Sequence, residues 1–133
     1  MTGIVIVVHA PLGDAMSEMA RHVLGDSVAD TLAVHDIFPE DQPEARAPAV
    51  LADIRRLGRE NGVLVLTDLV GATPANIAKR VVAQAQTEGL TCCVLAGLNT
   101  PMLLRALTYR GLSLAETREK ALAGGVQGCL RVD

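Results

Sequence analysis

The chain is poor in aromatic residues, with no Trp, one Tyr and one Phe among its 133 residues. Its formal net charge of −3 shows that it lacks the excess of basic residues that binding to a polyanion requires. The shortage of aromatic rings also removes the usual stacking surface for unpaired bases. Nucleic acid is therefore excluded as an expected partner, and the core must be built from aliphatic side chains.

Signals of export and membrane insertion are also missing. No charged segment precedes the first apolar run, and no apolar run approaches the ~20 residues that span a bilayer. We therefore expect a cytoplasmic protein that meets a membrane only indirectly. Half of the residues are hydrophobic, which is enough to form the core of a single domain covering residues 1–133.

The three cysteines are odd in number and lack the spacing of metal ligands. We interpret Cys92, Cys93 and Cys129 as small hydrophobic residues in strands, with the adjacent pair facing opposite sides. No Gly-x-Gly-x-x-Gly or Gly-Lys-Ser/Thr loop follows the first apolar run, so a nucleotide enzyme is not indicated. The sequence thus predicts no bound metal and no cofactor.

Apolar runs alternate with amphipathic segments along the chain. The run that leads to His9, Ile4–Val8, and the run Val63–Thr67 show no polar alternation, which is typical of strands covered on both faces. Alternating strands and helices predict an α/β fold with a mostly parallel sheet, in the flavodoxin-like order 2-1-3-4, and helices on both faces. Further strands are predicted over residues 32–37 and 91–96, and helices over residues 14–24, 44–59, 75–86, 100–109 and 113–123.

Three helices have recognisable starts. Thr73 is predicted as an N-cap with Pro74 at the first helical position, and Asn99-Thr100-Pro101 repeats the same pattern. Ser113 and Glu116 have the spacing of a capping box. After the last helix, Gly124-Gly125 separates it from Val126–Val132, which we predict to be an edge strand.

Polar residues end two of the buried strands. His9 follows the first and Asp68 the third, so in the predicted strand order both lie where ligands of parallel sheets bind. A carboxylate can accept one imidazole N–H, which leaves the other ring nitrogen as a nucleophile. The helices that begin at Thr73-Pro74 and near Gly13 would offer free backbone N–H groups to an anion. This combination predicts phosphate chemistry.

Other function classes account for these residues less well. A metal cluster that includes His35-Asp36 lacks a second histidine at helical spacing, and a solvated loop explains the pair equally well. A receiver domain of a response regulator needs acidic residues after its first strand, where this chain has His9-Ala10-Pro11. A pure interaction module remains open, although it leaves the placement of His9 and Asp68 unexplained.

Two longer motifs resemble the IIA component of the mannose-type sugar phosphotransferase system. They are the segments 67–76 (Thr-Asp-Leu-Val-Gly-Ala-Thr-Pro-Ala-Asn) and 96–103 (Ala-Gly-Leu-Asn-Thr-Pro-Met-Leu), and each combines a strand end, a glycine turn and a proline-started helix. Together with the strand that ends in His9, the resemblance runs nearly end to end. The family usually has glycine after the histidine, where this chain has Ala10-Pro11.

The resemblance implies roles for individual residues and partners. His9 would take a phosphoryl group from the phosphocarrier HPr and pass it to a IIB component or use it as a regulatory signal. Asp68 would orient the ring, and Thr73 would bind the phosphate together with Gly71 and Ala72. The resemblance also implies a homodimer in which the C-terminal strand is exchanged between subunits.

Two alternatives stay open within this interpretation. The chain could serve a sugar permease through separate subunits, or it could act in a regulatory branch whose phosphorylation state controls a partner protein. The phosphoryl-donor subunit of a dihydroxyacetone kinase has a similar histidine strand. That subunit would not be expected to carry the two motifs at residues 67–76 and 96–103.

Overall fold

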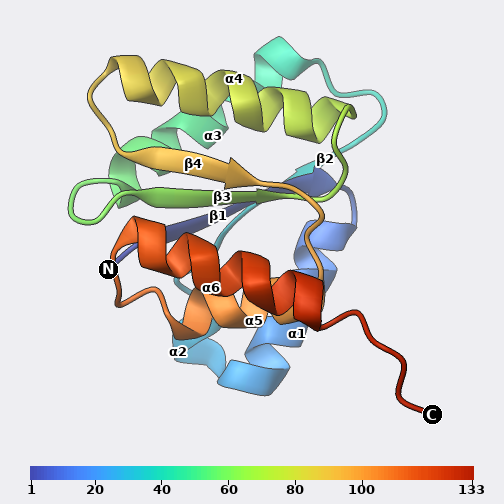
Figure 1. The fold of residues 1–133 in the computed structure, drawn as a ribbon. Helices are drawn as coiled ribbons and strands as arrows, with labels where there is room; N and C mark the ends of the chain where they lie inside the picture. The colour runs from blue at the N-terminus through green and yellow to red at the C-terminus, as the bar shows by residue number, and fades with distance from the viewer.

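A four-stranded parallel sheet in the order β2-β1-β3-β4 forms the centre of the computed structural model, which describes residues 1–133 (Figure 1). In the register of the sheet, Val5 of the first strand lies opposite Ala33 of the second and Val65 of the third. The predicted α/β class and strand order are confirmed. The strands are β1 (Gly3–His9), β2 (Ala33–Ile37), β3 (Val63–Thr67) and β4 (Cys92–Leu95).

Helices cover both faces of this sheet, as Figure 1 shows. Two of them pack on one face, and the other long helices pack on the opposite face. The first group is α3 (Pro43–Leu57) and α4 (Thr73–Thr87), and the second is α1 (Leu12–Leu24), α5 (Thr100–Thr108) and α6 (Leu114–Gln127). None of the helices combines the length and the apolar character that crossing a membrane would require.

The central strands β1 and β3 are buried on both faces. Every residue of β1 before His9 is buried, and so is every residue of β3. Successive side chains enter different clusters, so that Val5 packs with α3 and α4 whereas Ile4 packs with α1, α5 and α6. Each fully buried Val, Ile or Leu contributes about 1.5–3 kcal/mol through removal from water. Because both faces of β1 and β3 are buried, the sequences of these strands are apolar without polar alternation.

The cysteines follow the same alternation only in part. Cys92 lies in the α3/α4 cluster and Cys93 packs against the opposite one, as predicted. Cys129 is exposed and belongs to no strand, so the prediction for it is wrong. It lies in the segment that follows α6, where no sheet covers it.

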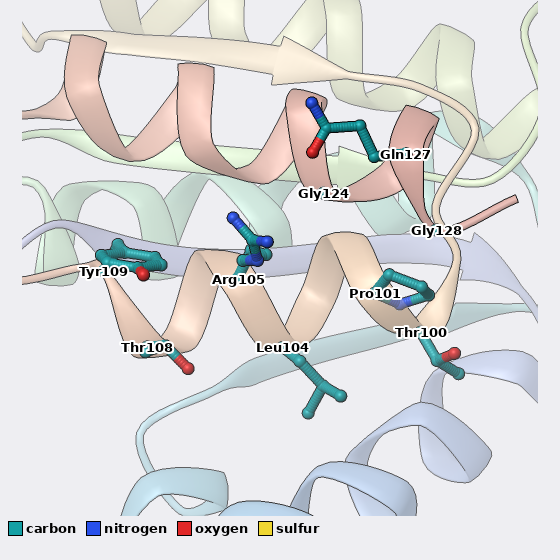
Figure 2. Close-up of a pocket in the computed structure, with 9 residues that line it drawn as sticks. All are labelled: Thr100, Pro101, Leu104, Arg105, Thr108, Tyr109, Gly124, Gln127 and Gly128. Carbon is teal, nitrogen blue, oxygen red and sulfur yellow. The ribbon is translucent and has the colours of Figure 1, made fainter.

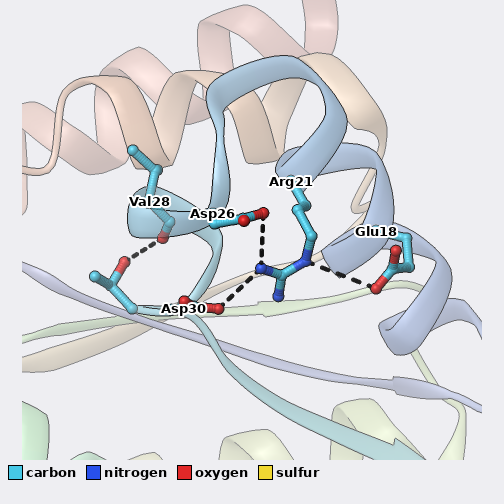
Figure 3. Close-up of polar contacts among 6 residues, drawn as sticks. Glu18, Arg21, Asp26, Val28 and Asp30 are labelled. Carbon is cyan, nitrogen blue, oxygen red and sulfur yellow. Dashed lines mark hydrogen bonds and ion pairs between the residues drawn. The ribbon is translucent and has the colours of Figure 1, made fainter.

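A short helix that the sequence did not predict, α2 (Asp26–Ala29), follows α1. Figure 3 shows how Arg21 of α1 connects the two segments by donating to Asp26 at 3.2 Å and to Asp30 at 2.9 Å. These hydrogen bonds to Asp30 and Asp26 raise the pKa of the Arg21 guanidinium. At four residues, α2 is too short to show a helical period, and these tertiary contacts stabilise it instead.

The C-terminal segment differs from the prediction of a strand over Val126–Val132. Helix α6 continues through Gly124 and Gly125 to Gln127, and residues 128–133 form no strand in the single chain. The two glycines are buried against α5, where a Cβ at Gly125 would lie 2.8 Å from Met102 Cε. The glycine pair therefore permits close helix packing and does not end the helix.

Two of the predicted helix starts are confirmed and one is wrong. Asn99 accepts from the backbone N–H of Met102 at 3.0 Å, and Ser113 forms its capping box with Glu116. The N-cap of α4 is Ala72, with no side-chain hydrogen bond, and Thr73 is the first helical residue. The hydroxyl of Thr73 is thus not used for capping.

Candidate active site

The ends of β1 and β3 bring His9 and Asp68 together. Because the two strands are parallel neighbours, their carboxyl ends lie at the same edge of the sheet. His9 Nδ1 lies 2.8 Å from Asp68 Oδ2, and the backbone N–H of His9 donates to the same oxygen at 3.1 Å. The second carboxylate oxygen accepts from the N–H of Leu69 at 3.0 Å. The predicted pair is therefore in direct contact.

The side chains of His9 and Asp68 differ in exposure, so they suit different chemical roles. The carboxylate of Asp68 is 14% exposed, whereas the ring of His9 is 49% exposed. Burial raises the pKa of Asp68, but the hydrogen bonds from the ring and backbone of His9 outweigh it and hold that pKa below its usual value. An ionised carboxylate only accepts hydrogen bonds, so Nδ1 of His9 carries the proton and Nε2 keeps a free lone pair.

A cavity of about 270 Å³ opens beside the histidine. It is lined by the end of β1, by the loop that follows β2 and by the start of α4. Its lining residues are His9, Ala10, Ile37, Phe38, Pro39, Asp41, Thr73 and Pro74. Asp41 lies in the acidic segment 40–44 and is a lining residue that no motif in the sequence predicts. The available signal was that this loop follows a parallel strand and must therefore reach the same edge of the sheet.

The start of α4 offers hydrogen-bond donors near this cavity. Thr73 lines it, and the backbone N–H groups of Thr73 and Ala75 have no partner within the chain. Gly71 makes the turn with a φ of 86°, and the N–H of Ala72 donates to the carbonyl of Leu69 at 3.3 Å. Of the three residues predicted to bind phosphate, Thr73 lies in the cavity, whereas Gly71 and Ala72 form the turn that leads to it.

The start of α1 keeps only the N–H of Leu12 free and so offers fewer donors than predicted. The N–H groups of Gly13 and Asp14 both donate to the carboxylate of Asp36, at 2.7 and 3.0 Å. His35 and Asp36 lie within β2, not in a solvated loop, and His35 is buried with Nε2 2.8 Å from Asp53 Oδ2. No group of three His, Cys, Asp or Glu residues is arranged to hold a metal ion.

A second hollow of about 510 Å³ lies between α5 and α6 (Figure 2). Arg105 of α5, Tyr109 directly after that helix and Gln127 of α6 line it, with no histidine or carboxylate among the lining residues. It shares no residue with the cavity beside His9 and has no pair of groups suited to acid, base or nucleophilic chemistry. The smaller cavity is therefore the candidate active site.

Comparison with known proteins identifies the family of this chain. Residues 3–122 match the EIIA-man family, which is described as PTS system fructose IIA component. The chain belongs to this family. Over 107 residues it is 30% identical to the PTS system mannose-specific EIIAB component of Escherichia coli. That match covers 80% of this chain and 31% of the relative, so the chain spans about a third of the relative's length.

Solved structures of EIIA proteins share its fold. One is phosphotransferase system component EIIA from Streptococcus agalactiae, with a TM-score of 0.85 at 22% identity, covering 98% of this chain and 97% of that one. Another is a mannose/sorbose-specific IIA subunit from Enterococcus faecalis, with a TM-score of 0.84 at 21% identity, covering 99% and 95%. The resemblance stated from the sequence is thereby confirmed at the level of family and fold.

Proposed function

We propose that this EIIA-man chain is a phosphoryl carrier that accepts a phosphoryl group from phospho-HPr on Nε2 of His9. The single observation that carries the proposal is the 2.8 Å contact between His9 Nδ1 and Asp68, because it leaves the other ring nitrogen free on a half-exposed ring. The acceptor of the phosphoryl group is a IIB component or a regulatory target.

The proposed transfer is a simple exchange of one phosphorus–nitrogen bond for another. The Nε2 lone pair of His9 attacks the phosphorus of the donor's phosphohistidine, and the donor's bond to phosphorus breaks. The proton on Nδ1 stays in its hydrogen bond with Asp68, whose charge stabilises the cationic ring that forms. In the onward step, a nucleophile of the acceptor forms a bond to phosphorus, the bond at Nε2 breaks, and its electron pair returns to the ring of His9.

The start of α4 is the proposed place for the transferred group. A phosphoryl group adds about −1.5 to −2 charges at neutral pH, and an N-terminus of a helix contributes roughly 0.3–1 kcal/mol to holding an anion. Thr73 lines the cavity with a hydroxyl and a free backbone N–H, and Gly71 and Ala72 form the turn that leads to it. This modest stabilisation suits a carrier, because the group must leave again.

Exposed apolar side chains around the cavity support a protein as the donor. Phe38 lines the cavity, while Leu69 and Val70 follow Asp68 directly, and all three are exposed. Clustered exposed apolar residues beside a reactive group are typical of a protein docking surface. A donor protein that carries its phosphohistidine on a small apolar surface would fit here.

The proposal extends to the whole chain. Residues 1–133 act as one cytoplasmic carrier domain that forms a homodimer and meets a membrane only through a permease complex. The genes encoded nearby distinguish a IIB acceptor from a regulatory target. Permease genes in the neighbourhood would favour transport, and their absence would favour regulation.

Phosphorylation in a reconstituted system tests this function. The protein is incubated with labelled phosphoenolpyruvate, Enzyme I and HPr, and the label on the chain is tested for stability in acid and alkali. We expect an acid-labile and alkali-stable label on the wild type and no label on His9→Ala. His22→Ala is the matched control, because His22 is exposed on α1 and has no hydrogen-bond partner. A label that persists in His9→Ala would rule out the assignment to this residue.

A further inference from the structure

Helix α1 begins directly after the turn that follows His9, and a side chain from the neighbouring strand holds its first N–H groups. Pro11 precedes the helix and makes no side-chain cap. Instead, Asp36 of β2 accepts from Gly13 through Oδ1 at 2.7 Å and from Asp14 through Oδ2 at 3.0 Å. One carboxylate thus satisfies two of the N–H groups that a helix start leaves free.

The backbone is shaped to admit this carboxylate. A Cβ built on Gly13 would lie 2.7 Å from Asp36 Oδ1 and 2.6 Å from Val34 Cγ1, so only glycine allows the approach. The carbonyl of Asp36 is itself held by Arg46 Nη2 at 3.0 Å. Both ends of the contact are therefore fixed, which distinguishes Asp36 from a freely rotating surface residue.

Asp36 and His9 lie on opposite faces of the sheet. In the register, Asp36 is opposite Val8, and His9 is opposite Ile37. Because successive side chains alternate, Asp36 faces α1 while His9 faces the side of α4. Asp36 acts on the histidine only through the turn between them.

That turn is fixed at both ends. At the first, Asp68 accepts from the ring and backbone of His9, and the N–H of Ala10 donates to Ile37 at 3.0 Å. At the second, Asp36 holds Gly13 and Asp14. Loss of the second anchor would loosen the turn where it joins α1, and small displacements of a reacting group are costly.

We infer that Asp36 is a positioning residue for His9, which it aligns by anchoring the turn between β1 and α1. The inference rests on the proposed function for its kinetic consequence. Asp36 also fills the N-terminus of α1 with a carboxylate of the protein itself. The N-terminus of α4, with the N–H groups of Thr73 and Ala75 free, therefore has more donors for a transferred phosphoryl group than that of α1.

Substitution of Asp36 tests the inference with two variants and one control. Asp36→Ala removes both acceptors, whereas Asp36→Asn keeps one acceptor oxygen and is expected to rescue part of the loss. Asp53→Asn is the control, because it removes the charge from the contact with His35 on the other face of the same strand and leaves the turn intact. Transfer from phospho-HPr is timed, and ring-nitrogen NMR signals of His9 are recorded for each protein.

We expect Asp36→Ala to be phosphorylated roughly 10- to 100-fold more slowly, with Asp36→Asn between it and the wild type. The ring signals of His9 should move from a pure Nδ1–H tautomer towards a mixture in Asp36→Ala. The control should keep both the rate and the signals even if its melting temperature falls. If Asp36→Ala does not fold, Asp36→Asn carries the same test with a smaller expected change.

Two results would overturn the inference: unchanged ring signals of His9 in the Asp36 variants, or an equal loss of rate in Asp53→Asn at an equal loss of stability. The proposed function has a separate point of failure. If the wild type itself is not phosphorylated by phospho-HPr, the carrier role is wrong, and the ring signals alone then decide whether Asp36 positions His9.

Discussion

In the proposed transfer, the charge of Asp68 stabilises the cationic ring that forms on His9. Asp68→Asn keeps the size of the side chain and one acceptor for the Nδ1 proton, so the fold should be retained. We expect it to slow phosphorylation of His9 by roughly 10²-fold or more, as in other carboxylate–histidine pairs. The rate of labelling by phospho-HPr measures the effect, and circular dichroism checks the fold.

Asp30→Asn is the matched control for this substitution. Asp30 is an exposed carboxylate whose partner is Arg21, and it lies outside the cavity of His9. Its variant should be phosphorylated at the wild-type rate. A wild-type rate for Asp68→Asn as well would remove Asp68 from the mechanism.

A second histidine–carboxylate pair, His35 with Asp53, makes the stability of the fold depend on pH. Burial raises the pKa of Asp53, but hydrogen bonds from Arg56 and His35 outweigh it and lower that pKa below its usual value. The carboxylate therefore stabilises the fold at any pH above about 3.9, the ordinary value in an unfolded chain. This contribution is lost as the pH falls through the lower value of the folded state.

We expect Asp53→Asn to lower the free energy of unfolding at pH 7 by about 1.5–3 kcal/mol, the range for a hydrogen bond to a charged group. The difference from the wild type should shrink as the pH falls below about 4. Urea titrations at a series of pH values measure it. A difference that stays constant down to acid pH would show that the charge of Asp53 does not contribute.

At the scale of elements, the close packing of α5 and α6 depends on glycine. A Cβ at Gly124 would collide with Arg105 Cγ and would lie 3.3 Å from the carbonyl of Pro101. Alanine normally favours a helix over glycine by about 1 kcal/mol, so the propensity alone predicts a gain in stability for Gly124→Ala. We expect the opposite, a loss of about 1–3 kcal/mol, because the added methyl must separate two packed helices.

Thermal unfolding compares Gly124→Ala with Gly111→Ala. A Cβ at Gly111 would meet nothing within 4 Å, and this glycine does not have a positive φ. The control should change stability by less than about 0.5 kcal/mol, as is usual for surface substitutions. A stabilised Gly124→Ala would show that α5 and α6 are not closely packed.

At the scale of the whole molecule, an edge strand and an apolar C-terminal segment are both left without a partner in the single chain. Strand β4 lies at one edge of the sheet, with β3 as its only neighbour. The segment after α6 carries Leu130, which is 67% exposed, and Val132, which is 90% exposed. An open strand edge and a free apolar segment are each unfavourable in water, and pairing between two copies would remove both.

We therefore expect the full chain to sediment as a dimer, and a chain that lacks residues 129–133 to sediment as a monomer or to lose solubility. The truncation leaves α6 intact to Gln127, so the fold itself should persist. Replacement of Leu130 and Val132 by Ser provides a second variant of unchanged length. A full-length protein that stays monomeric at micromolar concentration would contradict the predicted homodimer.

The sequence by itself determined the sheet and the placement of the reacting pair. The runs Ile4–Val8 and Val63–Thr67 have no polar alternation, and only strands buried on both faces tolerate such runs. Since parallel strands end at one edge, the residues that follow them, His9 and Asp68, had to lie near each other. The helix caps at Asn99 and Ser113 could also be predicted from the sequence, because each of those contacts spans only three residues.

Only the tertiary structure decided the features that depend on distant contacts. Gly124-Gly125 looks like a helix end in the sequence, and its packing against α5 makes it helical. The start of α1 looks like a free anion site, and the carboxylate of Asp36, 23 residues from Gly13, fills it. Such contacts leave no periodic trace in the sequence, because the partner of a side chain across a fold is set by the packing of whole elements and not by its neighbours in the chain.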